Sequence, residues 1–179
     1  GLGAAAAAGC AVLGDVQTAA ANSEPVSDEA VGVLIDLTRC SGCQSCALAC
    51  KTANNMPQPQ TVPGELDGGA LSFVDTRVSA HDTETYVKRQ CMHCLHPACA
   101  SACTVGALRK TAEGPVVYDS SKCIGCRYCQ YACPFGVPSY EWDNVFGLIR
   151  KCELCHGRLA AGDKPACVAA CPNDAVVHA

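Results

Sequence analysis

The sequence predicts a small α+β protein made of short strands, short helices and long loops. Seventeen cysteines recur along the chain in groups with short internal spacings, and brief β-prone runs lie between those groups. Aromatic residues make up only 5% of the chain, so ordinary packing predicts a thin core that needs cross-links or cofactors. With 179 residues, the chain fits one domain of ordinary size or two small halves.

The first 21 residues differ in composition from the rest, because they are rich in Ala and Gly and carry no charge before Asp15. We expect segment 1–21 to be the apolar and cleavage part of an export signal, or a retained anchor. Cys10 within it is a candidate lipidation site. Residues 22–30 are predicted to be a polar, acidic linker that leads into one main domain over residues 31–179.

The main domain contains a fourfold repeat of cysteine quartets, each of which ends in C-x3-C. The first and third quartets follow C-x2-C-x2-C-x3-C, whereas the middle gap has four residues in the second quartet and eleven in the fourth. In chain order the quartets are Cys40, Cys43, Cys46, Cys50; Cys91, Cys94, Cys99, Cys103; Cys123, Cys126, Cys129, Cys133; and Cys152, Cys155, Cys167, Cys171.

Short elements are predicted around these quartets. Val31 to Leu37 is a β-rich run before the first quartet. Between the second and third quartets, Ala107 to Lys110 and Pro115 to Tyr118 flank a Gly-containing turn, so we expect a short hairpin there.

Residues 51–90 form the longest insertion without cysteine. Its first part, Asn54 to Gly69, is rich in Pro, Gln, Asn and Gly and is expected to be irregular. Its second part offers two runs, Leu71 to Val78 and Glu84 to Arg89, that are expected to pair as strands. We expect the insertion to wrap the core or to meet a partner.

The quartet spacing favours iron–sulfur chemistry. Three cysteines two residues apart can curl around one face of an iron cubane, and the C-x3-C step sends the last cysteine toward another cluster, often with Pro after it. Cys133-Pro134 and Cys171-Pro172 keep that Pro. Structural zinc needs no third and fourth cysteine at these spacings, neighbouring C-x2-C cysteines bridge poorly, and a redox C-x-x-C would occur once. Zinc and disulfides remain the alternatives.

Other side chains near the quartets are expected to support the clusters. Each quartet already has four cysteines, so the histidines inside them are predicted to contact clusters or pack, with iron ligation as the alternative. These histidines are His93, His96 and His156. The aromatic residues beside the third quartet are predicted to be core that shields a cluster. They are Tyr128, Tyr131 and Phe135. No phosphate loop, carboxylate pair or nucleophile triad stands out, so we expect no catalytic site.

The charge pattern excludes one class of partner. The formal net charge is -4 and no block of Lys or Arg occurs, which argues against binding to nucleic acid. Four oxidised clusters of about −2 each would make the loaded chain much more negative, at about −12. Basic residues directly beside quartet cysteines are expected to offset this charge, the alternative being that they are solvated surface groups. They are Arg39, Lys51, Lys122, Arg127 and Lys151.

Three runs carry a resemblance to a known family: Cys91 to Cys99, Cys123 to Pro138, and Lys151 to Cys155. They resemble the four-cluster ferredoxin-like subunits of respiratory oxidoreductases, which include the beta subunits of formate dehydrogenase and other molybdopterin enzymes. The likeness is greatest to the hydrogenase-2 type of ferredoxin-like subunit and covers Val31 to Ala179. It implies a tandem bacterial-ferredoxin-like module, two fused two-cluster halves, with four [4Fe-4S] clusters as cofactors.

The resemblance also implies which cysteines share a cluster. Quartets one and four would exchange their last cysteines, and so would quartets two and three. The implied sets are Cys40, Cys43, Cys46 with Cys171; Cys152, Cys155, Cys167 with Cys50; Cys91, Cys94, Cys99 with Cys133; and Cys123, Cys126, Cys129 with Cys103.

From this resemblance we expect an electron-transfer subunit between a large catalytic redox subunit and an integral membrane quinone-reactive subunit or cytochrome. We expect it at the periplasmic or extracytoplasmic face of the membrane, exported folded, and attached through partners or the N-terminal segment. Two alternatives stay open: a structural iron–sulfur or zinc assembly module without a redox role, and a free soluble ferredoxin-like carrier.

Overall fold

The computed structural model describes residues 25–179, so the predictions for segment 1–21 and Cys10 lie outside the described residues. Within that range no helix exceeds nine residues and no strand exceeds six. Elements this short are marginal on their own and must be held by what they pack against. In chain order they are β1 (Val33–Ile35), α1 (Ser45–Ala53), β2 (Phe73–Val78), β3 (Glu84–Arg89), α2 (Ala98–Ser101), β4 (Leu108–Lys110), β5 (Val116–Tyr118), α3 (Tyr128–Ala132), β6 (Ser139–Tyr140), β7 (Ile149–Arg150), α4 (His156–Ala160), α5 (Ala166–Ala169) and β8 (Val176–His178).

The strands form two-stranded antiparallel sheets, β1 with β8, β2 with β3, β4 with β5, and β6 with β7. The predicted hairpin inside the insertion is confirmed, since Phe73 pairs with Arg89 and Val78 with Glu84. The predicted hairpin between the second and third quartets is confirmed as β4 and β5. The pairing of β1 with β8 joins the start of the main domain to the end of the chain.

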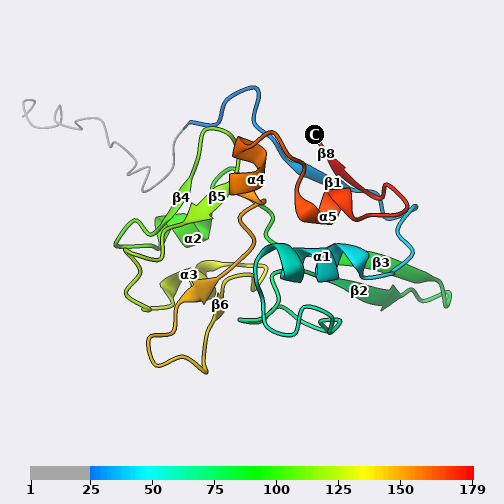
Figure 1. Cartoon of the computed structure of the whole chain (residues 1–179), viewed down its shortest axis with the longest axis horizontal. Helices are drawn as coiled ribbons and strands as arrows, with labels where there is room; N and C mark the ends of the chain where they lie inside the picture. The colour runs from blue at the N-terminus through cyan, green and yellow to red at the C-terminus, as the bar shows by residue number, and fades with distance from the viewer. Residues whose placement is uncertain (1–24) are drawn as a thin grey trace, which may run out of the picture.

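The elements gather into two groups, which Figure 1 shows at opposite sides of the molecule. In one group α1 packs against α5, beside the sheet of β1 and β8. In the other α2 packs against α3, beside the sheet of β4 and β5. Each group therefore combines two short helices with a two-stranded sheet. This confirms the α+β prediction, while the tandem arrangement stays a prediction at this point.

The backbone conformation of the first quartet's loop recurs in the third quartet, which has the same cysteine spacing. In the first quartet Gly42 and Gln44 adopt positive φ angles of 72° and 61°, and in the third Gly125 and Arg127 adopt 70° and 63°. These left-handed positions curl each loop before its helix begins. In the second and fourth quartets, α2 and α5 begin after a proline, in the matching runs 97–99 and 165–167, both Pro-Ala-Cys. Left-handed residues occur in these two quartets as well, at His93, Leu154 and Cys155, so it is the Pro-Ala-Cys helix start that distinguishes them.

Cysteine is part of every buried cluster of side chains in the described range. One cluster contains Cys50, Cys91 and Cys152, and a second contains Cys99 and Cys129. A third contains two further cysteines beside Val74 and Val176. These cysteines are Cys46 and Cys167. The apolar cores are therefore small, and each combines cysteine sulfur with a few aliphatic side chains.

The prediction that the aromatic residues beside the third quartet form core is wrong. Tyr128 is 60% exposed, Tyr131 is 83% exposed and Phe135 is 44% exposed. Positions 128 and 131 are one turn apart on α3, so they share a face, and that face points away from buried Cys129. The helix turns its cysteines inward and therefore places its tyrosines in solvent.

Among residues 25–179, no helix is both long and apolar enough to cross a bilayer.

Gly147 provides a test of how tightly the loop between β6 and β7 packs. A Cβ added there would lie 2.8 Å from ring atoms of Tyr140 and would overlap the carbonyl oxygen of Glu141. Because Gly147 also faces Gly125 in the third-quartet loop, G147A should lower the free energy of unfolding by about 1–3 kcal/mol. G157A is the matched control, since nothing lies within 4 Å of that Cβ. Anaerobic thermal unfolding that shifts equally in both variants would contradict this packing.

Candidate metal centres

Site 1 brings together three cysteines from the loop and first turn of α1 and one from the end of α5. All four line one small cavity, which Lys88 and Val74 also line. Cys46 is buried at the centre of this group, where burial and the neighbouring thiols raise its pKa. The four members of site 1 are Cys40, Cys43, Cys46 and Cys171.

Site 2 takes one cysteine from α1 and three from the fourth quartet, and all four line a second small cavity. Burial raises the pKa of Cys50 to about 12, and the nearby Cys152 and Cys167 contribute to this rise. The four members of site 2 are Cys50, Cys152, Cys155 and Cys167.

Sites 3 and 4 form in the other group of elements. Cys91 and Cys133 both act on the pKa of Cys99, which burial raises to about 11. Burial raises the pKa of Cys129 to about 12, and the nearby Cys103 and Cys123 contribute to this rise. Cys94 lies near Cys91, and exposed Cys126 shares the loop of Cys123 and Cys129. Because Cys99 also contributes to the raised pKa of Cys129, the division into two sites follows the sets that the resemblance implies: Cys91, Cys94, Cys99 and Cys133 as site 3, and Cys103, Cys123, Cys126 and Cys129 as site 4.

Neighbouring sites are linked by pairs of buried cysteines that share an apolar cluster, and in each pair one cysteine raises the pKa of the other. These pairs are Cys46 of site 1 with Cys167 of site 2, Cys152 of site 2 with Cys91 of site 3, and Cys99 of site 3 with Cys129 of site 4. The pairs follow one another from site to site in a single series. Each site also contains the last cysteine of a different quartet, the crossing that the resemblance implies; the role of these cysteines as iron ligands stays a prediction.

Several N–H groups are directed at cysteine sulfur. The backbone N–H of Ala175 donates to Cys171 Sγ at 3.3 Å, that of Leu154 to Cys152 Sγ at 3.4 Å, and that of Gly125 to Cys123 Sγ at 3.4 Å. In site 2 the Asn54 side-chain amide also donates to Cys50 Sγ at 3.6 Å. Hydrogen bonds of this kind favour the negatively charged form of sulfur.

Two of the basic residues expected to offset cluster charge are buried. Lys151 and Lys51 were expected beside cysteines, and both are buried, whereas Arg39 and Lys122 form exposed ion pairs. Arg127 lies over the rings of Tyr140 and Trp142, at 5.4 and 4.8 Å from their centroids. Sequence adjacency therefore identified a buried cation in two of five cases.

Two further buried lysines were missed because neither is next to a cysteine in sequence. Lys88 of β3 is 4% exposed and Lys110 of β4 is 2% exposed. The charge of Lys88 opposes the raised pKa of thiols in sites 1 and 2, and Lys110 is near Cys91 and Cys94 of site 3. Only the folded arrangement of the hairpins reveals their position, since no spacing in the sequence relates them to the sulfurs.

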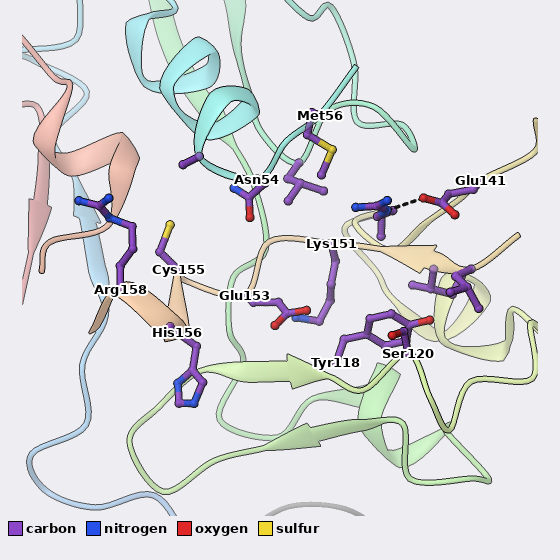
Figure 2. A pocket seen from close by; sticks show the side chains of 16 residues that line it. Asn54, Met56, Tyr118, Ser120, Glu141, Lys151, Glu153, Cys155, His156 and Arg158 are labelled. Carbon is purple, nitrogen blue, oxygen red and sulfur yellow. Dashed lines mark hydrogen bonds and ion pairs between the residues drawn. The ribbon is translucent and has the colours of Figure 1, made fainter. Parts of the chain in front are cut away.

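Lys151 lies between sites 2 and 3. Its ammonium group donates to the carbonyl oxygen of Cys152 at 2.8 Å and to that of Val116. Figure 2 shows its side chain extending toward Tyr118, with the Glu153 carboxylate nearby, in a cavity of about 490 Å³. Burial raises the pKa of Glu153, while Lys151 acts against that rise.

The histidines inside the quartets differ in their surroundings. His93 is half-buried, its Nδ1 accepts a hydrogen bond from the backbone N–H of Val116 at 3.0 Å, and desolvation, with Lys151 and Lys110, lowers its pKa to about 3. This imidazole is therefore neutral at physiological pH. His96 is exposed, and His156 lines the cavity of Figure 2.

The residues present fit [4Fe-4S] clusters in their chemistry. All sixteen described cysteines are free thiols, four to each site, with N–H donors and buried ammonium groups beside the sulfurs. In residues 25–179 no three Cys, His, Asp or Glu side chains converge closely enough to hold a single metal ion. The fit therefore rests on the donor set and on the charges around it. The class that this fold and these sites define is an iron–sulfur protein with a ferredoxin-like α+β architecture.

Comparison with known families agrees with this class. Residues 83–178 match the family described as the 4Fe-4S dicluster domain, and this protein belongs to that family. The matched stretch contains the second, third and fourth quartets, and it supports [4Fe-4S] clusters as the cofactor.

Several curated proteins are similar to the chain over most of its length. A protein of Nitratidesulfovibrio vulgaris (strain Hildenborough) is 42% identical over 177 residues, 93% of this chain and 48% of the relative. The hydrogenase-2 operon protein HybA of Escherichia coli O157:H7 is 40% identical over 92% of this chain and 56% of the relative. The B subunit of the anaerobic dimethyl sulfoxide reductase of E. coli K12 is 38% identical over 79% of this chain and 69% of the relative. The chain thus spans about half the length of the first two.

Gln44 offers a test of how site 1 is held to the insertion. Its side-chain amide donates to Val74 O at 2.6 Å and accepts from Val74 N at 2.8 Å, which joins the first quartet to β2. Q44M removes both hydrogen bonds, and we expect the free energy of unfolding around site 1 to fall by about 1–3 kcal/mol. The loaded variant should release iron to a chelator faster than wild type. Q130M, in the other regular quartet, makes no such bridge and serves as control; equal release from both variants would contradict this role of Gln44.

Proposed function

We propose that the chain is an electron-transfer subunit that relays single electrons through four [4Fe-4S] clusters. On this proposal the clusters occupy sites 1 to 4, with the sixteen cysteines as their iron ligands. The subunit would connect a large catalytic redox subunit, of the hydrogenase or molybdopterin type, to a membrane quinone-reactive subunit or cytochrome.

One observation carries the proposal: the four sites stand in series. Cysteines of successive sites are close enough to act on each other electrostatically, from Cys46 and Cys167 through Cys152 and Cys91 to Cys99 and Cys129. A series of redox centres in contact is the arrangement that carries electrons from one end of a protein to the other. A purely structural role for the cofactors has no need of such a series.

The proposal includes a tandem architecture. Sites 1 and 2 would belong to the half built from α1, α5, β1 and β8, and sites 3 and 4 to the half built from α2, α3, β4 and β5. Within each half the last cysteine of each quartet crosses to the partner site. The same pair of left-handed positions recurs in quartets one and three, and the same Pro-Ala-Cys helix start recurs in quartets two and four, which supports this duplication.

Two observations support binding to partner proteins. The relatives include a protein of a hydrogenase-2 operon and a subunit of an anaerobic dimethyl sulfoxide reductase, whose names refer to redox enzymes. At the site 4 end, Val145 is 93% exposed, Phe146 85% and Trp142 68%, and Arg127 of the third-quartet loop lies over the Trp142 ring. Exposed apolar surface of this kind is typical of a protein interface. We further propose that the assembly stands at the extracytoplasmic face of a membrane.

The proposal is tested on anaerobically purified protein by iron analysis and electron paramagnetic resonance. We expect about sixteen iron atoms per chain and, after reduction, the signals of interacting reduced clusters. Stoichiometric zinc without iron would contradict the cofactor. Four clusters that cannot be reduced would favour a structural assembly module instead.

Pairs of cysteine substitutions test the crossed sites. C171A and C46A each should remove one cluster, and because both lie in site 1, the double variant should still lose only about four iron atoms. C171A combined with C155A affects two sites and should lose about eight. Iron analysis and the number of paramagnetic centres report the result. Independent losses from C171A and C46A would show that the sites follow the sequence quartets instead.

Purification from the native membrane tests the partners. A tagged chain should be recovered with a larger redox protein, and substitution of Val145 and Phe146 by serine should weaken that association if the site 4 surface is an interface. L34S is the matched control, because Leu34 is exposed on β1, in the other group of elements. Recovery of the chain alone would favour a free soluble carrier.

A further inference from the structure

Lys88 is a buried cation that forms no ion pair with an acid in the part of the chain that the structure describes. It lies on β3, is 4% exposed, and its ammonium group donates to the side-chain oxygen of Gln90. An ammonium group buried without a counter-charge is strongly unfavourable, so an anion must lie close by when the protein is loaded.

The groups around Lys88 identify that anion. Lys88 lines the cavity of site 1, and it also acts on the thiols of Cys50, Cys152 and Cys167 in site 2. Its position is fixed by the hairpin, because Lys88 pairs with Val74, which Gln44 binds. The side chain is thus held at the junction of sites 1 and 2, beside sulfurs of both.

We propose that Lys88 is a residue that sets reduction potentials: its one charge serves both sites and makes the clusters of sites 1 and 2 easier to reduce. The inference rests on the proposed function, since it requires clusters at these sites. On reduction each cluster takes one electron from the donor, its charge becomes more negative by one, and no bond forms or breaks. A fixed positive charge nearby stabilises that reduced state more than the oxidised state.

The test is an anaerobic redox titration of the loaded chain followed by electron paramagnetic resonance. In K88M, which removes the charge and keeps the length of the side chain, two of the four reduction steps should move to more negative potential. We expect a change of at least about tenfold in the reduction equilibrium constant, about 59 mV for a one-electron step. The other two steps should stay in place. K88R keeps the charge and should restore potentials close to those of wild type.

K51M is the matched control. Lys51 is also buried, at 6% exposed, and is next to Cys50 in sequence, but its ammonium group donates to Thr61 O at 3.1 Å. We expect its removal to move the steps much less than K88M does. Four unchanged steps in a fully loaded K88M, or an equal shift in K51M, would overturn the inference.

Iron analysis separates the possible failures. Wild-type chain without four clusters would contradict the proposed function rather than the role of Lys88. If K88M loads only about half of the iron and K88R restores the rest, the two sites depend on the shared charge, which supports the inference. If the arginine variant fails to restore the iron, the charge is not what these sites require, and the inference is overturned.

Discussion

The constraint on which this structure depends is that cysteines from distant segments must meet at the same point. Cys171, near the end of the chain, joins the loop that contains Cys40, and Cys50 in α1 joins the fourth quartet. The helices and strands are too short to fold alone, and the apolar cores combine cysteine sulfur with a few aliphatic side chains. Iron bonds at these points would close long loops, as disulfides do in small secreted domains, and would stabilise the contact of α1 with α5 and of β1 with β8. The cofactor is therefore part of what holds the fold together.

Burying so much negative charge imposes a second constraint. Thiols in these sites are hard to ionise on their own, because burial raises the pKa of Cys50 and Cys129 to about 12. Iron, N–H donors and buried ammonium groups act in the opposite direction, since each favours the thiolate. The lysines lie at the junctions, with Lys88 between sites 1 and 2 and Lys151 between sites 2 and 3. One cation can then serve two anions, which suits a chain that must place its redox centres close together.

The sequence specifies those features that depend on local spacing. The quartets, the two hairpins and the irregular stretch 54–69 are all set by nearby residues, so they could be predicted. Features that depend on orientation could not. Tyr131 was expected in a core because it lies beside a cysteine-rich run, but helix α3 turns it outward. Lys88 is three residues from the nearest cysteine in sequence, and only the pairing of β3 with β2 places it at two sites. Which cysteines cross between quartets followed from family resemblance, since spacing alone leaves that question open.

The sites at the two ends of the series differ in the surroundings that would set their reduction potentials. The thiols of sites 1 to 3 have buried lysines beside them, whereas Cys129 in site 4 is influenced chiefly by burial and by other cysteines. Site 4 also contains exposed Cys126 and is bordered by exposed Tyr128 and Tyr131. Water near a cluster stabilises its more negative reduced state, so a partner that covers this surface would make site 4 harder to reduce. A fixed lysine sets a potential permanently, but a surface exposed to solvent sets one that docking can change. On the proposed function, electron transfer through site 4 is therefore the step that the partner itself can control.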